Sequence, residues 1–324
     1  MFDTTIASRR SWRSLPARRT GSIRWSGSAR AGCASSASSR PGEVLANAGR
    51  AHGSSADLGM GAAYVTGSTL KAVVLAGAID DGVVSPADRV DCEHGSWAVQ
   101  GKTLHDSGSY GGLSLPEMLQ VSSNIGFAKI FFRLGGRRTS SWLRAFHFGE
   151  MPAVDGAVAG WIPEYIEDDS VAGAEVAIGA KVTASPLQVA AAYGALANGG
   201  VYVAPTLTVR EGNSQGERIM KEEAAHVVAA MLEESVNGPM ATGKLARIAG
   251  VRVAGKTGTA SWDLPGDVEG RYASFVGFVP VEAPRFVILV GVEKPKDDAS
   301  GGDVAAPVFA RVAAHALAAG GRHE

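Results

Sequence analysis

A continuous apolar run at residues 72–79, Ala-Val-Val-Leu-Ala-Gly-Ala-Ile, constrains the fold more than any other stretch of the chain. A helix that is apolar on every side has to lie inside a protein, and the Asp80-Asp81-Gly82 sequence that follows is typical of a helix C-terminus. The sequence therefore predicts a buried helix over this run. The segment Gly67-Ser68-Thr69-Leu70-Lys71 leads into that helix and forms its first turn.

Ser68 and Lys71 lie three residues apart in this first turn, so they occupy the same face of the helix. The free N–H groups and the positive end of the helix dipole favour negative charge that develops at Ser68. A serine hydroxyl is a weak nucleophile until a base takes its proton, and a neutral lysine can be that base. Keeping a lysine neutral at pH 7 costs about 4–5 kcal/mol, because its unperturbed pKa is roughly 10.4. A catalytic role for Lys71 therefore calls for burial and a second cation.

The second cation is Lys256, on the first of three strands predicted near the C-terminus. Gly255 and Gly258 thin this strand, which suits a ligand backbone that approaches the strand edge. A substrate peptide that adds there as an extra strand is held by main-chain hydrogen bonds. Lys256 and the hydroxyl groups of Thr257 and Thr259 are suitable donors to a carboxylate. We therefore predict a substrate-binding strand around Lys256.

A third polar element, Ser122-Ser123-Asn124, separates two apolar helical segments. Its residue types prefer turns and helix caps. Ser122 can relay a proton there, and Asn124 can orient a side chain or a substrate amide. A second Ser-x-Asn pattern at 235–237 is interpreted as a chance occurrence. Each pattern alone is common, so the informative signal is the ordered set of Ser-x-x-Lys, Ser-x-Asn and Lys-Thr-Gly, each in a fitting context.

The rest of the chain predicts an α+β fold, with an antiparallel sheet flanked by helices and an all-helical cluster alongside. Two helices begin with capping boxes, at Ser114 and Ser185, and the last two strands are joined tightly enough to pair antiparallel. Residues 42–46 are a short strand, and 149–181 are expected to be loops. In chain order the other predicted segments are helices at 114–121, 125–134, 139–148, 185–197 and 221–234, strands at 251–261, 272–279 and 286–293, and a helix at 304–319.

The three motifs, in this order, resemble the transpeptidase domain of class B penicillin-binding proteins, within the penicillin-binding and serine β-lactamase-like superfamily. The resemblance covers about residues 42–319. Phrases similar to those of the family recur along this range: Asn124-Ile125-Gly126, Ser185-Pro186-Leu187-Gln188, Ala197-Asn198-Gly199-Gly200, Phe275-Val276-Gly277-Phe278 and Ala305-Ala306-Pro307-Val308-Phe309.

The resemblance implies a role for each motif residue. Ser68 resembles the acylated nucleophile and Lys71 its general base. Ser122 is similar to the residue that passes a proton to the leaving D-alanine nitrogen, with Asn124 beside it. Lys256 would supply the field that keeps Lys71 neutral.

The resemblance also implies how substrate is held. Thr257, Gly258 and Thr259 resemble the residues that bind the substrate and its carboxylate. The backbone N–H groups of Ser68 and Thr259 would form the oxyanion hole, in which each donor is typically worth ~3–4 kcal/mol.

The function implied is a peptidoglycan D,D-transpeptidase that cross-links stem peptides ending in D-Ala-D-Ala through a Ser68 acyl-enzyme and is inhibited by β-lactams. Such an enzyme needs no cofactor and no metal. Its place is the cell envelope, on the periplasmic side of the inner membrane, with a glycosyltransferase and other cell-wall synthesis proteins as partners. The choice between a role in cell division and one in cell elongation stays open.

The start of the chain departs from the family pattern. Residues 1–41 are rich in Ser, Arg and Ala and are expected to be a disordered or aberrant leader, which leaves 42–324 as the transpeptidase domain. Residues 22–41 do not alternate, so the sheet is expected to lack its first strand. Neither a membrane anchor nor an export signal is visible, and no stretch reaches the ~18 apolar residues that span a bilayer. Val65-Thr66-Gly67 stands where the family usually has Glu-Pro-Gly.

Composition and spacing exclude several other classes. The formal net charge of −1 gives no reason to expect nucleic acid as a partner. Cys33 and Cys92 show no metal-ligand spacing. Glu164 and Glu167 do not match the water-activating pattern of class A β-lactamases. Two alternatives nevertheless stay open: a D,D-carboxypeptidase or β-lactamase, and a non-catalytic penicillin-binding fragment or sensor.

Overall fold

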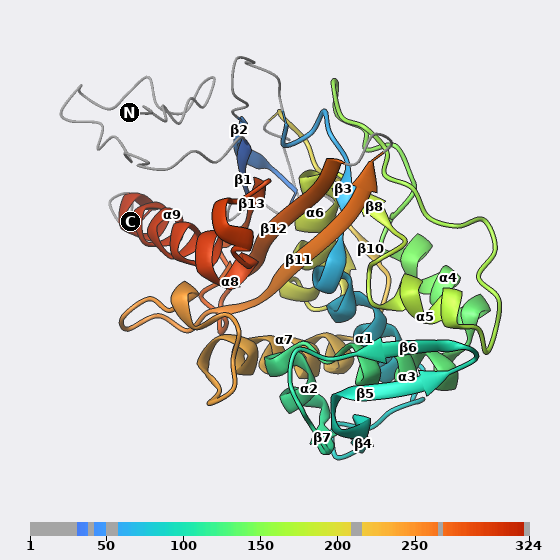
Figure 1. Ribbon diagram of the computed structural model, residues 1–324. Coiled ribbons are helices and arrows are strands. Elements are labelled where there is room, and N and C mark those ends of the chain that lie inside the picture. Colours follow the sequence, from blue (N-terminus) through green and yellow to red (C-terminus); the bar gives the residue numbers. More distant parts are fainter. Residues whose placement is uncertain (1–30, 38–41, 50–57, 209–215, 265–267, 321–324) are drawn as a thin grey trace, which may run out of the picture.

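The largest sheet of the protein has five antiparallel strands in the spatial order β11-β12-β13-β1-β2 (Figure 1). The structure is a computed structural model, and it describes residues 31–37, 42–49, 58–208, 216–264 and 268–320. The predicted antiparallel pairing of the last two strands is confirmed. In chain order the five strands are β1 (Ala31–Ala37), β2 (Val44–Gly49), β11 (Ala254–Leu264), β12 (Val268–Val279) and β13 (Phe286–Glu293).

The expectation that the sheet lacks its first strand is wrong. β1 lies between β13 and β2 and pairs antiparallel with both, with Ala31 opposite Glu293 and Cys33 opposite Gly49. The pairing of β1 is made by backbone groups and does not depend on alternation of polar and apolar side chains, which reflects only how the two faces of a strand are buried. Residues 31–37 of the expected leader therefore belong to the sheet. The remaining leader residues, 1–30 and 38–41, lie outside the described residues.

The two faces of the sheet pack against different helices. Side chains alternate along a strand, so Phe275 and Ile288 face the C-terminal helix α9, where Phe309 stacks edge-on against Phe275 at a centroid distance of 4.7 Å. Val276 and Leu289 belong to the core on the other face. Helix α6 contacts β12, β13 and β1. The sheet is thus covered on both faces, as the α+β prediction requires.

Most of the helices form the second part of the fold, below and to the right of the sheet in Figure 1, while the C-terminal helix lies at its left. Both predicted capping boxes are present, at Ser114 and Ser185. The helices are α1 (Lys71–Asp80), α2 (Leu115–Val121), α3 (Asn124–Leu134), α4 (Gly136–Ala145), α5 (Val171–Ala177), α6 (Pro186–Ala197), α7 (Glu222–Asn237), α8 (Gly301–Val304) and α9 (Ala306–Gly320), with 3-10 turns η1 (Gly67–Leu70), η2 (Glu93–Gly95), η3 (Lys244–Ala246) and η4 (Lys296–Asp298).

Helix α5 lies inside the 149–181 segment that was predicted as loops, so that part of the prediction is wrong. Its seven residues are too few to show a helical period in the sequence. A helix this short depends on packing for its stability. The Ser170 hydroxyl accepts a hydrogen bond from Gly173 N at 2.9 Å and caps the helix. A Cβ at Gly173 would lie 2.1 Å from the ring of Phe131 on α3, so the two helices touch closely there.

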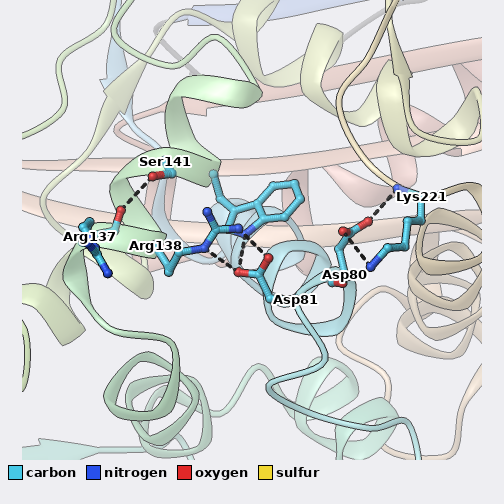
Figure 2. A network of polar contacts seen from close by, with 7 residues as sticks. Asp80, Asp81, Arg137, Arg138, Ser141 and Lys221 are labelled. Atoms are coloured by element: carbon cyan, nitrogen blue, oxygen red, sulfur yellow. Dashed lines mark hydrogen bonds and ion pairs between the residues drawn. The ribbon is translucent and has the colours of Figure 1, made fainter.

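Helix α1 is the buried centre of the helical part, as its apolar sequence predicts. Every residue from Lys71 to Ala78 is buried. Its C-terminus is held from two sides (Figure 2). Asp81 accepts hydrogen bonds from Arg138 Nε at 2.8 Å and Trp142 Nε1 at 3.0 Å on α4, while Asp80 accepts one from Lys221 N at 2.6 Å at the start of α7. The helix that carries the first motif is therefore fixed at the end away from Ser68.

Four two-stranded sheets complete the described structure. Within the described ranges no helix is both long enough and apolar enough to cross a membrane. The small sheets are β3 (Tyr64–Val65) with β8 (Thr183–Ala184), β4 (Arg89–Asp91) with β7 (Gly112–Ser114), β5 (Ser96–Val99) with β6 (Lys102–His105), and β9 (Val201–Tyr202) with β10 (Glu217–Arg218).

Candidate active site

Ser68 lies in η1, the 3-10 turn that runs directly into α1. Gly67 before it has a φ of +53°, a conformation that favours glycine, and its N–H donates to Gly179 O at 3.1 Å. The Thr66 hydroxyl donates to the carbonyls of Gly179 and Val182, both at 3.3 Å. Ser68 stays partly exposed although the residues on either side of it are buried. The local structure thus presents one serine at the start of a buried helix.

The contact between Gly179 and Gly67 leaves no room for a side chain. Gly179 has a φ of +84°, and a Cβ there would lie 2.0 Å from Gly67 O. We expect Gly179→Ala to lower the free energy of unfolding by about 3 kcal/mol and to slow any reaction at Ser68. Gly156→Ala is the matched control, because Gly156 has a φ of +81° and open space around its Cα, so only backbone strain of about 1 kcal/mol is expected. Equal losses in urea titrations of the two variants would contradict the close contact.

Lys71 is fully buried and surrounded by acceptors from the second motif. Its Nζ donates to Ser122 O at 2.6 Å, to Asn124 Oδ1 at 2.8 Å and to Ser122 Oγ at 3.3 Å. Burial, and after it the charge of Lys256, lower the pKa of Lys71 well below its usual value, while the carboxylate of Asp106 acts in the opposite direction. The structure therefore brings Lys71, Ser122 and Asn124 together. Ser68 is not among the hydrogen-bond partners of Lys71 in the described part of the chain; such catalytic contacts often tighten only when substrate is bound.

Lys256 is also fully buried, on β11. Its Nζ donates to Thr257 O at 3.2 Å and to Thr257 Oγ1 at 3.3 Å. Burial lowers the pKa of Lys256 to about 7. The sequence analysis called for burial and a second cation, Lys256, to keep Lys71 neutral. The structure gives burial as the larger cause and Lys256 as the second.

Asp106 holds the second motif in place, and the sequence analysis missed it. Its carboxylate accepts hydrogen bonds from Ser123 Oγ at 2.5 Å, Asn124 N at 2.5 Å and Ile125 N at 3.0 Å. It thereby satisfies free N–H groups at the start of α3. Ser122 has a φ of +58°, so the chain turns sharply at the point where the motif faces Lys71. No local pattern points to Asp106, because it lies 16 residues before Ser122 and meets the motif only in the folded chain.

The lysine strand is packed directly against the nucleophile segment. A Cβ at Gly258 would lie 2.9 Å from Thr69 Cγ2 and 2.5 Å from Ser274 Oγ, and one at Gly255 would lie 2.5 Å from the ring of Phe275. The space at both glycines is therefore filled by the chain's own atoms. Their small size lets β11 approach η1 and its neighbouring strand.

The two threonines of the strand have different surroundings. Thr257 is buried, and its hydroxyl exchanges a hydrogen bond with Thr242 Oγ1 at 2.9 Å. Thr259 is partly exposed, and its hydroxyl accepts from Gly301 N at 3.1 Å, at the start of α8. Thr242 is a second residue that the sequence analysis missed, since it comes from the segment after α7. Both hydroxyl groups are thus fixed from outside the strand.

Of the other residues considered in the sequence, Glu164, Glu167 and Ser235 lie apart from this constellation, whereas Cys92 contacts its second motif. Glu164 and Glu167 are exposed. Ser235, in the second Ser-x-Asn pattern, is buried in the last turns of α7, where its hydroxyl bonds the carbonyls of Met231 and Leu232. Cys92 is a buried free cysteine whose Sγ accepts a hydrogen bond from Ser123 Oγ.

Comparison with known proteins agrees with this geometry. The family model of the penicillin-binding protein transpeptidase domain matches residues 32–314. A probable peptidoglycan D,D-transpeptidase FtsI from Caulobacter vibrioides is 31% identical over 271 residues, which cover 77% of this chain and 45% of the relative. The chain spans less than half the length of the curated relatives that it matches.

Solved structures share the fold. The transpeptidase domain of penicillin-binding protein 3 from Burkholderia pseudomallei has a TM-score of 0.83 at 28% identity, over 90% of this chain and 88% of that one. Penicillin-binding protein 3 from Mycobacterium tuberculosis, solved in complex with aztreonam, has a TM-score of 0.81 at 27% identity, over 90% and 73%. The family match spans the sheet, the helical part and all three motifs, so the chain belongs to the family of penicillin-binding protein transpeptidase domains.

Proposed function

We propose that this chain is the catalytic domain of a peptidoglycan D,D-transpeptidase that reacts through a Ser68 acyl-enzyme. The observation that carries the proposal is the buried Lys71, held by Ser122 and Asn124 one helical turn after a partly exposed serine. Burial lowers the pKa of this amine well below its usual value, which favours the neutral form that can act as a base. The relatives named as peptidoglycan D,D-transpeptidases support the same assignment.

Acylation follows from these positions. Lys71 takes the proton from Ser68 Oγ, which attacks the carbonyl carbon between the two terminal D-alanines. The N–H groups of Ser68 and Thr259 hold the oxyanion. Ser122 Oγ, within reach of Lys71 Nζ, passes the proton to the leaving nitrogen, the C–N bond breaks and D-alanine departs. An amine from a second stem peptide then attacks the ester carbonyl and takes the acyl group. The bond to Ser68 Oγ breaks, and a proton from the amine passes to this oxygen.

The substrate carboxylate is assigned to the lysine strand. Thr259 is partly exposed, and Thr257 and Lys256 lie behind it as buried donors. Gly258 leaves the strand close to Thr69, so a peptide added along β11 runs past Ser68. A β-lactam carboxylate fits the same donors.

The wider setting of the enzyme follows from the same assignment. The transpeptidase domain begins at β1 and not at residue 42, because β1 is part of the sheet. Its substrates are stem peptides ending in D-Ala-D-Ala, in the cell envelope on the periplasmic side of the inner membrane, with a glycosyltransferase and other cell-wall proteins as partners. The alternative of a non-catalytic fragment or sensor was motivated by the leader and by a missing first strand, and β1 supplies that strand. The reaction as written needs no cofactor or metal.

The lifetime of the acyl-enzyme tests the proposal. Purified protein is labelled with a fluorescent penicillin and followed by intact mass, together with turnover of a D-alanyl peptide thioester in the presence of a D-amino acid acceptor. Stable labelling with transfer to the acceptor is the expected result. Label that fades within minutes would favour a D,D-carboxypeptidase or β-lactamase, and stable label without transfer a penicillin sensor. Well-folded protein that takes no label would overturn the proposal.

A further inference from the structure

The β5–β6 hairpin reaches across the helical part and joins the start of α5. Gln100, at the tip of the hairpin, uses both ends of its side-chain amide: Nε2 donates to Asp169 O at 2.5 Å, and Oε1 accepts from Val171 N at 3.1 Å. Val171 N is a free donor in the first turn of α5. One side chain therefore ties the hairpin tip to the helix N-terminus.

A second contact lies one turn further along the helix. Lys102 Nζ on β6 and Glu175 Oε1 on α5 form an ion pair at 2.8 Å, with side-chain exposures of 58% and 20%. A two-stranded hairpin is only marginally stable by itself, so these contacts matter for its position. Trp97 anchors its base, packed edge-on against Phe132 at 5.6 Å. The tip depends on Gln100 and on the ion pair. We call these three residues the clasp.

The two elements that the clasp joins lead to opposite sides of the active site. Strand β6 ends at His105, whose carbonyl accepts from Asn124 Nδ2 at 2.9 Å, and the next residue is Asp106, which holds the Ser122–Asn124 turn. Helix α5 leads to Gly179, whose carbonyl accepts from Gly67 N directly before Ser68. One path, from β6 to Asp106, therefore fixes the partners of Lys71. The other path, from α5 to Gly179, fixes the segment that carries Ser68.

We propose that the clasp of Gln100, Lys102 and Glu175 sets the spacing between Ser68 and the Lys71–Asn124 side of the site, so that these are positioning residues for acylation. The inference rests on the proposed function. Reacting groups have to be held within tenths of an ångström, and a displacement of about 1 Å costs on the order of 10²-fold in rate. A tie between the two paths is well placed to prevent such a displacement, although none of its residues touches the reacting atoms.

A charge-swap cycle tests the clasp. Lys102→Glu, Glu175→Lys and the double variant are compared with wild type for the acylation rate constant and for the dissociation constant of the non-covalent penicillin complex. Gln100→Gly is the second route, since glycine suits the φ of +49° and the substitution removes the side chain with both of its amide contacts. Arg252→Glu is the matched control for Lys102→Glu. Its ion pair with Glu233 has side-chain exposures of 57% and 17%, and the substitution changes the net charge as Lys102→Glu does.

The clasp predicts that Lys102→Glu, Glu175→Lys and Gln100→Gly each lower the acylation rate constant about tenfold, with the dissociation constant nearly unchanged. The double swap should restore most of the rate, and Arg252→Glu should stay within about twofold of wild type. Unchanged acylation in the three variants, or a double swap as slow as the singles, overturns the inference. Wild type that takes no label overturns the proposed function instead, so the two failures are distinct.

Discussion

Ser68→Ala abolishes covalent β-lactam labelling. The alanine has no atom that can form the ester, and removing the nucleophile of a serine hydrolase costs on the order of 10⁶-fold in rate. The substitution adds no bulk at a partly exposed position, so the fold should be retained. Intact-mass measurement after incubation with a penicillin should show a stoichiometric adduct on wild type and none on the variant, with equal thermal midpoints.

Ser122→Ala is the control for this experiment. It removes a hydroxyl from the same site, 3.3 Å from Lys71 Nζ, and leaves the nucleophile in place. Its labelling should be slower by about 10²-fold but should reach completion, since loss of a proton relay impairs the reaction without removing the bond-forming atom. An adduct on Ser68→Ala, located by peptide mapping at another residue, would show that the assigned nucleophile is wrong.

The motif residues could be found from the sequence because each signal is local. Ser68 and Lys71 are three residues apart on one helical turn, and a helix that is apolar on every side is expected to be buried. The turn at Ser122 follows from residues that prefer caps. Neither motif by itself shows that Lys71 contacts Ser122 and Asn124, which lie about 50 residues further along the chain. That contact was expected only from the order of the three motifs, and the structure gives its distances.

The supporting residues could not be found in this way. Asp106, Thr242 and Gly179 act through contacts with segments far from them in the chain, and their own neighbourhoods have no periodic or capping pattern that marks them. β1 was missed for a related reason, since its place in the sheet is set by backbone hydrogen bonds to its two neighbouring strands and not by a pattern of its side chains. Helix α5 was missed because packing against α3 stabilises it more than its propensity does.

The glycines of the lysine strand have a second role that the sequence did not show. Gly255 and Gly258 were interpreted as thinning the strand for a ligand at its edge, and both also admit neighbouring parts of the protein. A sequence shows that a backbone has to be approached closely, but it does not show by what. The fold decides that question.

Lys71→Met slows acylation by about 10³- to 10⁴-fold, the second largest effect that we expect. Methionine has a similar length and no basic group, so Ser68 loses the amine that takes its proton. The rate of wild type should rise with pH as Lys71 loses its proton and then level off, and this rise should be absent from the residual reaction of the variant. The rise should occur well below pH 10, because burial lowers the pKa of Lys71. Lys71→Arg is the control with retained charge, and it should be as slow as the methionine variant, since arginine stays protonated.

The same substitution has a second consequence in the stability of the fold. Because the pKa of Lys71 is lower in the folded than in the unfolded protein, the unfolded chain binds more protons between the two values, and the unfolding free energy of wild type rises with pH in that window. The stability of wild type relative to Lys71→Met should therefore fall as the pH falls from about 10 toward neutral, and level off below the folded-state pKa. Urea titrations of both proteins across this range measure the difference. A difference that does not change with pH would mean that Lys71 is not held as a buried, neutral amine, and the base assigned to Ser68 would have to be sought elsewhere.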